Sequence, residues 1–190
     1  MGLDMYLRAQ KYVSGWRHNP DEETNEYERL VEMFGMGEFV TDDSPSAYVE
    51  FTVGYWRKAN QVHSWFVREC QGGVDECQAT DVAIEQLVDL REVCLRVLAS
   101  TKLVPGQVIH SVLYSNEHPK GAVQMQPGQI MEDPTEAERW LAPEDGFFFG
   151  NQDFDEGYWQ DLQRTVAIVD RCLLLNDTPG YWSFVYQSSW

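Results

Sequence analysis

The sequence predicts an α+β fold in which three to four helices pack on a small, mostly antiparallel sheet, with a long irregular insert. Three observations support this class. Apolar and polar residues alternate near both ends of the chain, as is typical of half-buried strands. Helical apolar spacing occurs at several places between them. Residues 101–145 contain five prolines and little periodicity, so we expect them to form an excursion from a single domain over residues 1–190.

The N-terminal part is expected to form a strand and an amphipathic helix. Residues 4–13 predict the strand, because Met5, Leu7 and Ala9 alternate with polar neighbours. Residues 21–34 predict the helix, whose acidic beginning suits the positive end of a helix dipole. The buried stripe of this helix is expected to consist of Tyr27, Leu30, Val31 and Phe34.

The middle of the chain is expected to add a strand and two helices. Residues 47–53 are rich in β-branched and aromatic side chains, and the strand that they predict should break at Gly54. A helix is expected from Tyr55 to Cys70. Another helix is expected over residues 83–100, with Asp81 as its N-cap.

The second half of the chain shows weaker patterns until its last third. Within the insert, residues 108–114 could form a strand or a hairpin arm, and residues 135–141 could form a short helix. A long helix is expected over residues 155–176. An alternating strand is expected from residue 181 to the last residue.

Composition and charge restrict the class of protein. Lys and Arg number 14 and Asp and Glu 31, for a formal net charge of −17, and aromatic residues make up 13%. This aromatic content excludes a disordered acidic tail. The charge argues against direct binding to nucleic acid or anionic membranes. With no signal peptide and no apolar run near the roughly 18 residues of a membrane span, we expect a cytoplasmic protein in which Cys94 and Cys172 are reduced and buried.

The segment from Tyr55 to Phe66 holds the densest set of side chains suited to ligand recognition. On a helix, Trp56, Asn60 and His63 would share one face. Arg57 would lie on a neighbouring edge. Aromatic rings combined with Arg and Asn suit a nucleobase or another planar ligand. The alternative is that His63 is a hydrogen-bonded core residue and that Arg57 is simply solvated.

Two aromatic segments could complete such a pocket. The run Gly146–Gly150 encloses Phe147–Phe149, and one of these rings could form a wall, with core packing as the alternative. Trp190 could line a pocket, fill a core groove or line an interface. The predicted ligand-binding set is Tyr55, Trp56, Arg57, Asn60, His63, Trp65, Phe148 and Trp190.

The sequence predicts no catalytic residue, no metal and no cofactor. It contains no Cys-x2-Cys or His-Glu-x-x-His pattern and no glycine-rich phosphate loop. The acids Asp153, Asp155 and Glu156 could hold a hard cation, but a helix N-terminus also explains them. Two other functions stay open. In the first, the ten acids from Glu132 to Asp161 imitate DNA and inhibit a host nucleic-acid-binding protein, although they could also form an ordinary solvated surface. In the second, the protein is a small hydrolase that uses His63.

Four motifs give the chain a resemblance to a group of small bacteriophage and prophage proteins. They are Met1-Gly-Leu-Asp-Met-Tyr-Leu7, the run from Gly54 to Val67, Phe147-Phe-Phe-Gly150 and Tyr186-Gln-Ser-Ser-Trp190. The resemblance covers the order of nearly the whole chain, except residues 17–44 and 101–143. It implies an accessory protein, of the counter-defence kind, in the cytoplasm of the host cell.

We therefore expect a binding protein that holds a small nucleotide-like or other planar anionic ligand. Its partners would be this ligand and, as further alternatives, a second copy of the chain or a host protein. Arg57, Lys58 and Arg68 make this part of the sequence a local positive region in an acidic protein, which suits an anionic ligand.

Overall fold

The computed structural model describes residues 2–16, 21–41, 43, 45–113, 121–146 and 149–190, so the predicted site residue Phe148 lies outside the described residues. The described elements, in chain order, are β1 (Asp4–Ser14), α1 (Asp21–Met33), β2 (Ser46–Arg57), α2 (Asn60–Glu69), β3 (Thr80–Val82), α3 (Ile84–Ser100), β4 (Leu103–Leu113), β5 (Ala122–Met131), α4 (Thr135–Trp140), α5 (Glu156–Asn176) and β6 (Trp182–Ser189).

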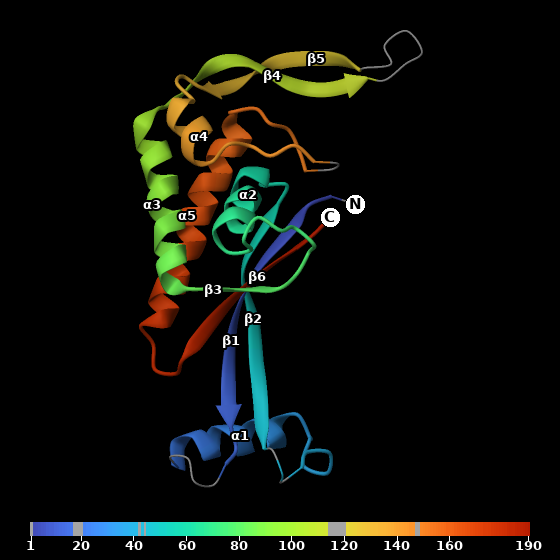
Figure 1. Cartoon of the computed structure of the whole chain (residues 1–190), viewed down its shortest axis with the longest axis vertical. Coiled ribbons are helices and arrows are strands. Elements are labelled where there is room, and N and C mark those ends of the chain that lie inside the picture. The colour runs from blue at the N-terminus through green and yellow to red at the C-terminus, as the bar shows by residue number, and fades with distance from the viewer. Residues whose placement is uncertain (1, 17–20, 42, 44, 114–120, 147–148) are drawn as a thin grey trace.

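An antiparallel sheet forms the centre of the molecule. Its described strands lie in the order β2-β1-β6-β3. Asp4 of β1 lies opposite Ser189 of β6, so the two ends of the chain are neighbours (Figure 1). Helices α3 and α5 run side by side next to the sheet (Figure 1). The α+β class with a mostly antiparallel sheet is confirmed.

The core lies between one face of this sheet and helices α2, α3 and α5. Met5, Leu7 and Ala9 of β1 are fully buried, which confirms the alternation predicted for the first strand. Cys94 and Cys172 are buried on α3 and α5 as free thiols. Burial raises the pKa of Cys94 to about 12 and that of Cys172 to about 11, so both thiols behave as small apolar side chains.

The second strand continues through Gly54, so the prediction of a helix beginning at Tyr55 is wrong. Gly54 and Trp56 are buried, while Tyr55 and Arg57 are exposed, which is the alternation of a strand. The strand ends at Arg57. The next residue, Lys58, has a backbone φ of 61°, and its N–H donates to Leu3 O at 2.8 Å. Helix α2 therefore begins only at Asn60.

Gly54 allows close packing rather than a break. A Cβ atom at this position would lie 2.7 Å from Cγ2 of Ile168 on α5 and 3.1 Å from the indole ring of Trp56. Only glycine lets the strand and the helix approach this closely. The sequence shows the glycine but not the helix that packs on it.

The described part of the insert is mostly regular rather than irregular. Strands β4 and β5 form an antiparallel hairpin, and α4 is the short helix expected at 135–141. Pro105 and Pro127 lie within these strands, which is compatible with a two-stranded ribbon because each strand is an edge and its outward N–H groups need no partner. Most side chains of the ribbon are exposed or half-buried, so its sequence shows little apolar alternation. The possible strand or hairpin arm predicted at residues 108–114 falls largely within β4.

Helix α1 packs differently from the prediction. Tyr27 is buried, but Leu30 and Val31 are only half-buried, and Phe34, just beyond the helix, is 71% exposed. Figure 1 shows the reason, since α1 lies at one end of the molecule, across the ends of β1 and β2 and away from the other helices. The predicted stripe is thus covered at its first residue only.

The remaining elements agree with the predictions except at one cap. Helices α3 and α5 and strand β6 occupy the expected segments. Asp81 lies in β3 and does not cap α3, because the helix begins after Ala83, whose N–H donates to the side chain of Gln86 at 2.9 Å. Within the described part of the chain, no helix has the length and apolar character needed to cross a membrane.

Candidate functional site

An aromatic cluster brings several of the predicted site residues together. Trp190 packs edge-on against Phe149, with ring centroids 5.9 Å apart, and Phe149 packs edge-on against His63 at 5.3 Å. The rings grouped around Phe66, at centroid distances of 3.9, 5.3 and 6.0 Å, are those of Tyr186, Trp65 and Trp56. The cluster joins α2, β2, β6 and the loop before α5.

The rings of this cluster pack the core of the protein. Trp56 and His63 are fully buried and Trp65 is nearly so, whereas Trp190 is 49% exposed at the edge. The four main clefts formed by the described residues are lined by other side chains. Stacking of a planar ligand on Trp56 or Trp65 would therefore require the core to open.

His63 is held in a buried polar chain. Its Nδ1 lies 2.7 Å from the Tyr186 hydroxyl and its Nε2 lies 3.0 Å from Asp75 Oδ2. A neutral ring that donates from Nε2 to Asp75 and accepts at Nδ1 from Tyr186 satisfies both neighbours. Burial, with the Asp75 charge as a smaller contribution, raises the pKa of Tyr186 well above its usual value and keeps the phenol protonated. His63 thus ties the loop before β3 to the core.

Asn60 fixes the loop that precedes α5. Its amide nitrogen donates to the backbone oxygens of Phe149 and Asn151, at 3.2 and 2.9 Å, and its amide oxygen accepts from the backbone N–H of Glu144 at 3.3 Å. Because both ends of the amide already bind backbone groups, Asn60 positions the neighbouring residues rather than meeting a ligand directly.

The residues at the end of β2 point in different directions. The Trp56 indole N–H donates to Thr165 Oγ1 of α5 at 2.9 Å. Tyr55 lies on the opposite face of the sheet, where its hydroxyl donates to Asp4. Arg57 also bonds Asp4, at 3.3 Å, but its side chain is more than half exposed and lines a cleft on the protein surface. The predicted set is therefore divided among the core, the sheet face and this cleft.

The cleft, which we call the Arg57 cleft, has a volume of about 330 Å³. It lies between the end of β2, the first turn of α2 and the beginning of α5. Its described lining residues are Arg57, Lys58, Gln61, Gly150, Asn151, Asp153, Asp155, Gly157, Tyr158, Gln160, Asp161 and Arg164. The lining is mainly polar, and its aromatic member, Tyr158, is nearly buried and donates from its hydroxyl to Leu141 O.

Basic side chains converge on the Arg57 cleft. Arg57 and Lys58 reach it from the end of β2, and Arg164 reaches it from α5. Arg68, expected to belong to the same positive region, instead pairs with Glu69 on the exposed side of α2. Gln61, Asp161 and Arg164 also line the cleft, although none of them belongs to the predicted ligand-binding set. They are polar residues beside the apolar stripes of two helices, and the sequence does not show that these helices are neighbours.

Asp161 gives the cleft a carboxyl with unusual acidity. Burial raises its pKa to about 6, while the hydrogen bond from Gln61 Nε2, at 3.3 Å, and the charge of Arg164 act in the opposite direction. Asp153 Oδ2 is buried and has no hydrogen-bond partner among the described residues. Such groups occur at functional sites because a ligand can satisfy them.

The backbone of the cleft is closely fixed. Lys58 holds a left-handed φ of 61°, which is uncommon for a residue with a side chain. Gly150 has a φ of 105°, and a Cβ there would lie 3.1 Å from Lys58 O. Asp155 caps α5 by accepting from Tyr158 N at 3.0 Å and also accepts from Asn151 at 3.1 Å. These contacts set the side chains of both walls in place.

Several of the acids at 132–161 are paired or lie in the Arg57 cleft. Glu132 pairs with Lys102, Glu136 accepts from Trp140, and Asp155 and Asp161 belong to the cleft. Among the described residues, no three His, Cys, Asp or Glu side chains are grouped so that they could hold a metal ion. Asp153 and Asp155 therefore serve the cleft and the helix cap.

Comparison of the chain with family models, with curated proteins and with solved structures gives no significant match.

Proposed function

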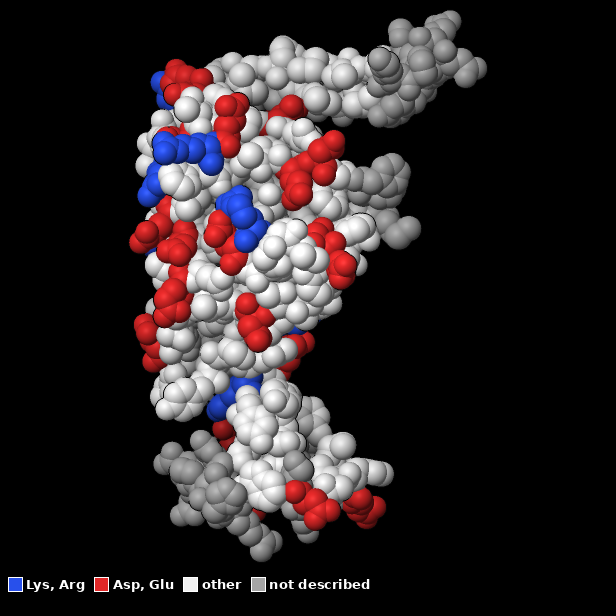
Figure 2. Space-filling view, viewed as in Figure 1, with Lys and Arg blue, Asp and Glu red and all other residues white. Residues whose placement is uncertain are grey.

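We propose that this protein binds a small anionic molecule in the Arg57 cleft. The observation that carries the proposal is that Arg57, Lys58 and Arg164 line one cleft in a protein with a net charge of −17. Three aspartates, Asp153, Asp155 and Asp161, line the same cleft beside them. Figure 2 shows Asp and Glu spread over the displayed face, with Lys and Arg in a few small groups. A local group of cations in such a surface favours one anionic ligand over extended anionic polymers.

The residues that line the cleft indicate which chemical groups the ligand carries. Arg57, Lys58 and Arg164 suit phosphate or carboxylate oxygens. The carboxyl groups of Asp153 and Asp161 suit amino or hydroxyl groups, since a carboxylate accepts hydrogen bonds. A nucleotide-like molecule combines both kinds of group. The aromatic stacking expected from Trp56 and Trp65 is replaced in this proposal by polar recognition.

The role that follows is sequestration rather than catalysis. The chain resembles phage proteins, and a phage accessory protein that holds a nucleotide-derived signal of its host would lower the free concentration of that signal. Such a role needs a fixed, charged cleft and no reacting group.

The proposal is tested by thermal unfolding with a panel of bacterial signalling nucleotides and sugar phosphates. A ligand that binds the native state raises the midpoint Tm according to its concentration and its Kd. We expect at least one anionic compound to raise Tm in the parent protein and in Arg68→Gln, which alters an arginine outside the cleft. Arg57→Gln combined with Arg164→Gln should remove the shift. Equal shifts in this double variant, or no shift with any compound, would contradict the proposal.

A further inference from the structure

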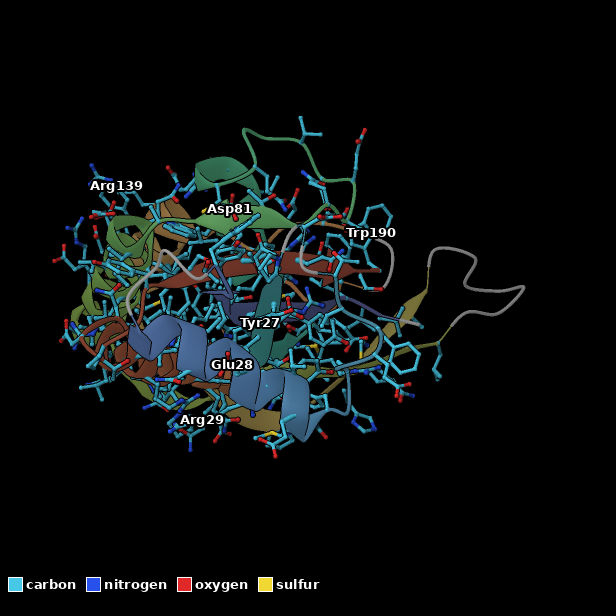
Figure 3. The ribbon with its side chains drawn as sticks, turned by 90° about the horizontal axis from the view of Figure 1, so that it is seen from below. Tyr27, Glu28, Arg29, Asp81, Arg139 and Trp190 are labelled. Carbon is cyan, nitrogen blue, oxygen red and sulfur yellow. The ribbon has the colours of Figure 1, made fainter. Side chains whose placement is uncertain are left out.

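A second surface, far from the Arg57 cleft, exposes an unusual number of large apolar side chains. We call it the arm: it consists of α1, residues 34–41 and the adjoining ends of β1 and β2. Figure 3 looks along the molecule from this end and shows Tyr27, Glu28 and Arg29 on α1, nearest the viewer. The most exposed apolar side chains of the arm are Met33, Phe34, Phe39 and Tyr48, each more than 70% exposed.

These side chains are exposed by an ordered backbone. Met36 N donates to Val31 O at 2.9 Å and Gly35 N to Glu32 O at 3.1 Å, a helix end closed by Gly35 with a φ of 64°. Val40 N then donates to Met36 O at 3.1 Å. A backbone held in this way presents its apolar side chains in fixed positions, although folding alone would favour their burial.

Helix α1 packs on the end of β1, and the outer side of the arm stays uncovered. Tyr27 packs on Gly15, where a Cβ would lie 2.4 Å from the tyrosine ring. Lys11 bonds Glu26 at 2.7 Å. Beyond these contacts, Val31 lies half-buried in a groove of about 490 Å³ whose rim carries the acids Glu28, Glu32 and Glu38.

We infer that the arm is a docking surface for a protein segment with apolar side chains at its centre and Lys or Arg around them. The apolar part follows from Phe34, Phe39 and the groove. The basic part follows from charge complementarity, because Glu28, Glu32 and Glu38 line the groove and none of its described lining residues is Lys or Arg. A helix with this pattern fits a groove of this kind in other complexes.

The same charge argues against the other occupants. In a symmetric dimer built on the arm, the acidic rims of the two copies would face each other and repel. An anionic membrane surface would repel the arm for the same reason. The inference does not depend on the function of the Arg57 cleft, since the two surfaces share no described residue.

The test uses two synthetic amphipathic helical peptides with identical leucine positions, one with lysines on its polar face and the other with glutamates. Calorimetric titration into the full-length protein should show binding of the lysine peptide, weakened by salt, and none of the glutamate peptide. Hydrogen exchange should place the protection on residues of the arm. No binding, equal binding of both peptides, or protection confined to other residues would overturn the inference.

Matched variants distinguish specific binding at the arm from non-specific binding to exposed apolar side chains elsewhere. Phe34→Ser with Phe39→Ser should weaken binding about tenfold or more, as loss of central apolar anchors does. Val123→Ser with Met125→Ser changes two exposed apolar side chains of β5, which are 53% and 51% exposed, and should leave binding unchanged. The reverse order of effects would overturn the inference. So would a dimer that forms with rising concentration and is abolished by the Phe34 and Phe39 changes, because the occupant would then be a second copy.

Discussion

The surroundings of Asp161 predict that the stability of the protein depends on pH. Burial raises its pKa to about 6, above the value of about 3.9 for an unfolded aspartate, so the folded protein holds this proton more tightly. The contribution to stability is therefore complete below pH about 4 and is lost as pH rises through about 6. Protonation also removes a negative charge from the cleft, so an anionic ligand should bind more tightly below that pH.

Asp161→Asn should remove this dependence. The variant cannot ionise, and its amide can still bind Gln61, so we expect it to be more stable than the parent at pH 7, by up to about 3 kcal/mol, and equal to it near pH 4. Urea unfolding between these pH values measures the difference. Asp177→Asn, at the exposed end of α5, should follow the parent. A constant difference between Asp161→Asn and the parent at all pH values would contradict the raised pKa.

The buried chain from Tyr186 through His63 to Asp75 supplies a second prediction at this scale. Tyr186→Phe removes the hydroxyl that lies 2.7 Å from His63 Nδ1 and leaves a buried nitrogen without its partner, which costs about 1–3 kcal/mol in the free energy of unfolding. Tyr181→Phe changes a tyrosine that is 98% exposed and should alter stability by less than about 0.5 kcal/mol. Equal stabilities in chemical denaturation would show that this hydrogen bond makes no net contribution.

At the scale of elements, the junction of β2 and α2 shows what the sequence can and cannot predict. The alternation of buried and exposed side chains continues from Gly54 to Arg57, but it was masked by the helical spacing of the residues that follow. The glycine was interpreted as a strand end, because its close packing depends on α5, which lies more than 100 positions later. Helices α3 and α5 and strand β1 were predictable because they have long, regular apolar patterns. In these elements the local sequence alone shows which face is buried.

Gly54→Ala tests the packing interpretation. The added methyl group would lie 2.7 Å from Ile168 Cγ2, so strand and helix must separate, and we expect a loss of about 1–3 kcal/mol in the free energy of unfolding. Gly37→Ala is the matched control, because a Cβ there has no described atom within 4 Å. If thermal unfolding shows the two variants to be equally stable, the close approach of α5 does not explain the glycine.

At the scale of the whole molecule, the candidate site depends on packing between distant segments. Gln61 and Asp161 are hydrogen-bonded across 100 positions of sequence, and Arg164 joins Arg57 only because α5 packs beside β2. Of the predicted ligand contacts, Arg57 lines the cleft, whereas Asn60 binds backbone groups beside it. The apolar patterns predict which side chains are buried. They do not predict which polar side chains from distant segments lie close together in the fold.

The arm is the second feature that appears only at this scale. The spacing of Tyr27, Leu30, Val31 and Phe34 is that of a buried helix face, but the chain itself fully buries only Tyr27. Such a disagreement between a local pattern and the fold is expected where another molecule completes the surface.

The central claim, that Arg57 and Arg164 hold a small anionic ligand, is tested most directly by identifying what the protein retains from cells. The protein is purified from a bacterial host at low ionic strength and heated, and the released small molecules are quantified by mass spectrometry. We predict one anionic compound in near-stoichiometric amount from the parent and from Arg68→Gln, and its loss from the variant with Arg57→Gln and Arg164→Gln. An identical profile from all three proteins, or no retained anionic compound from the parent, would contradict the claim.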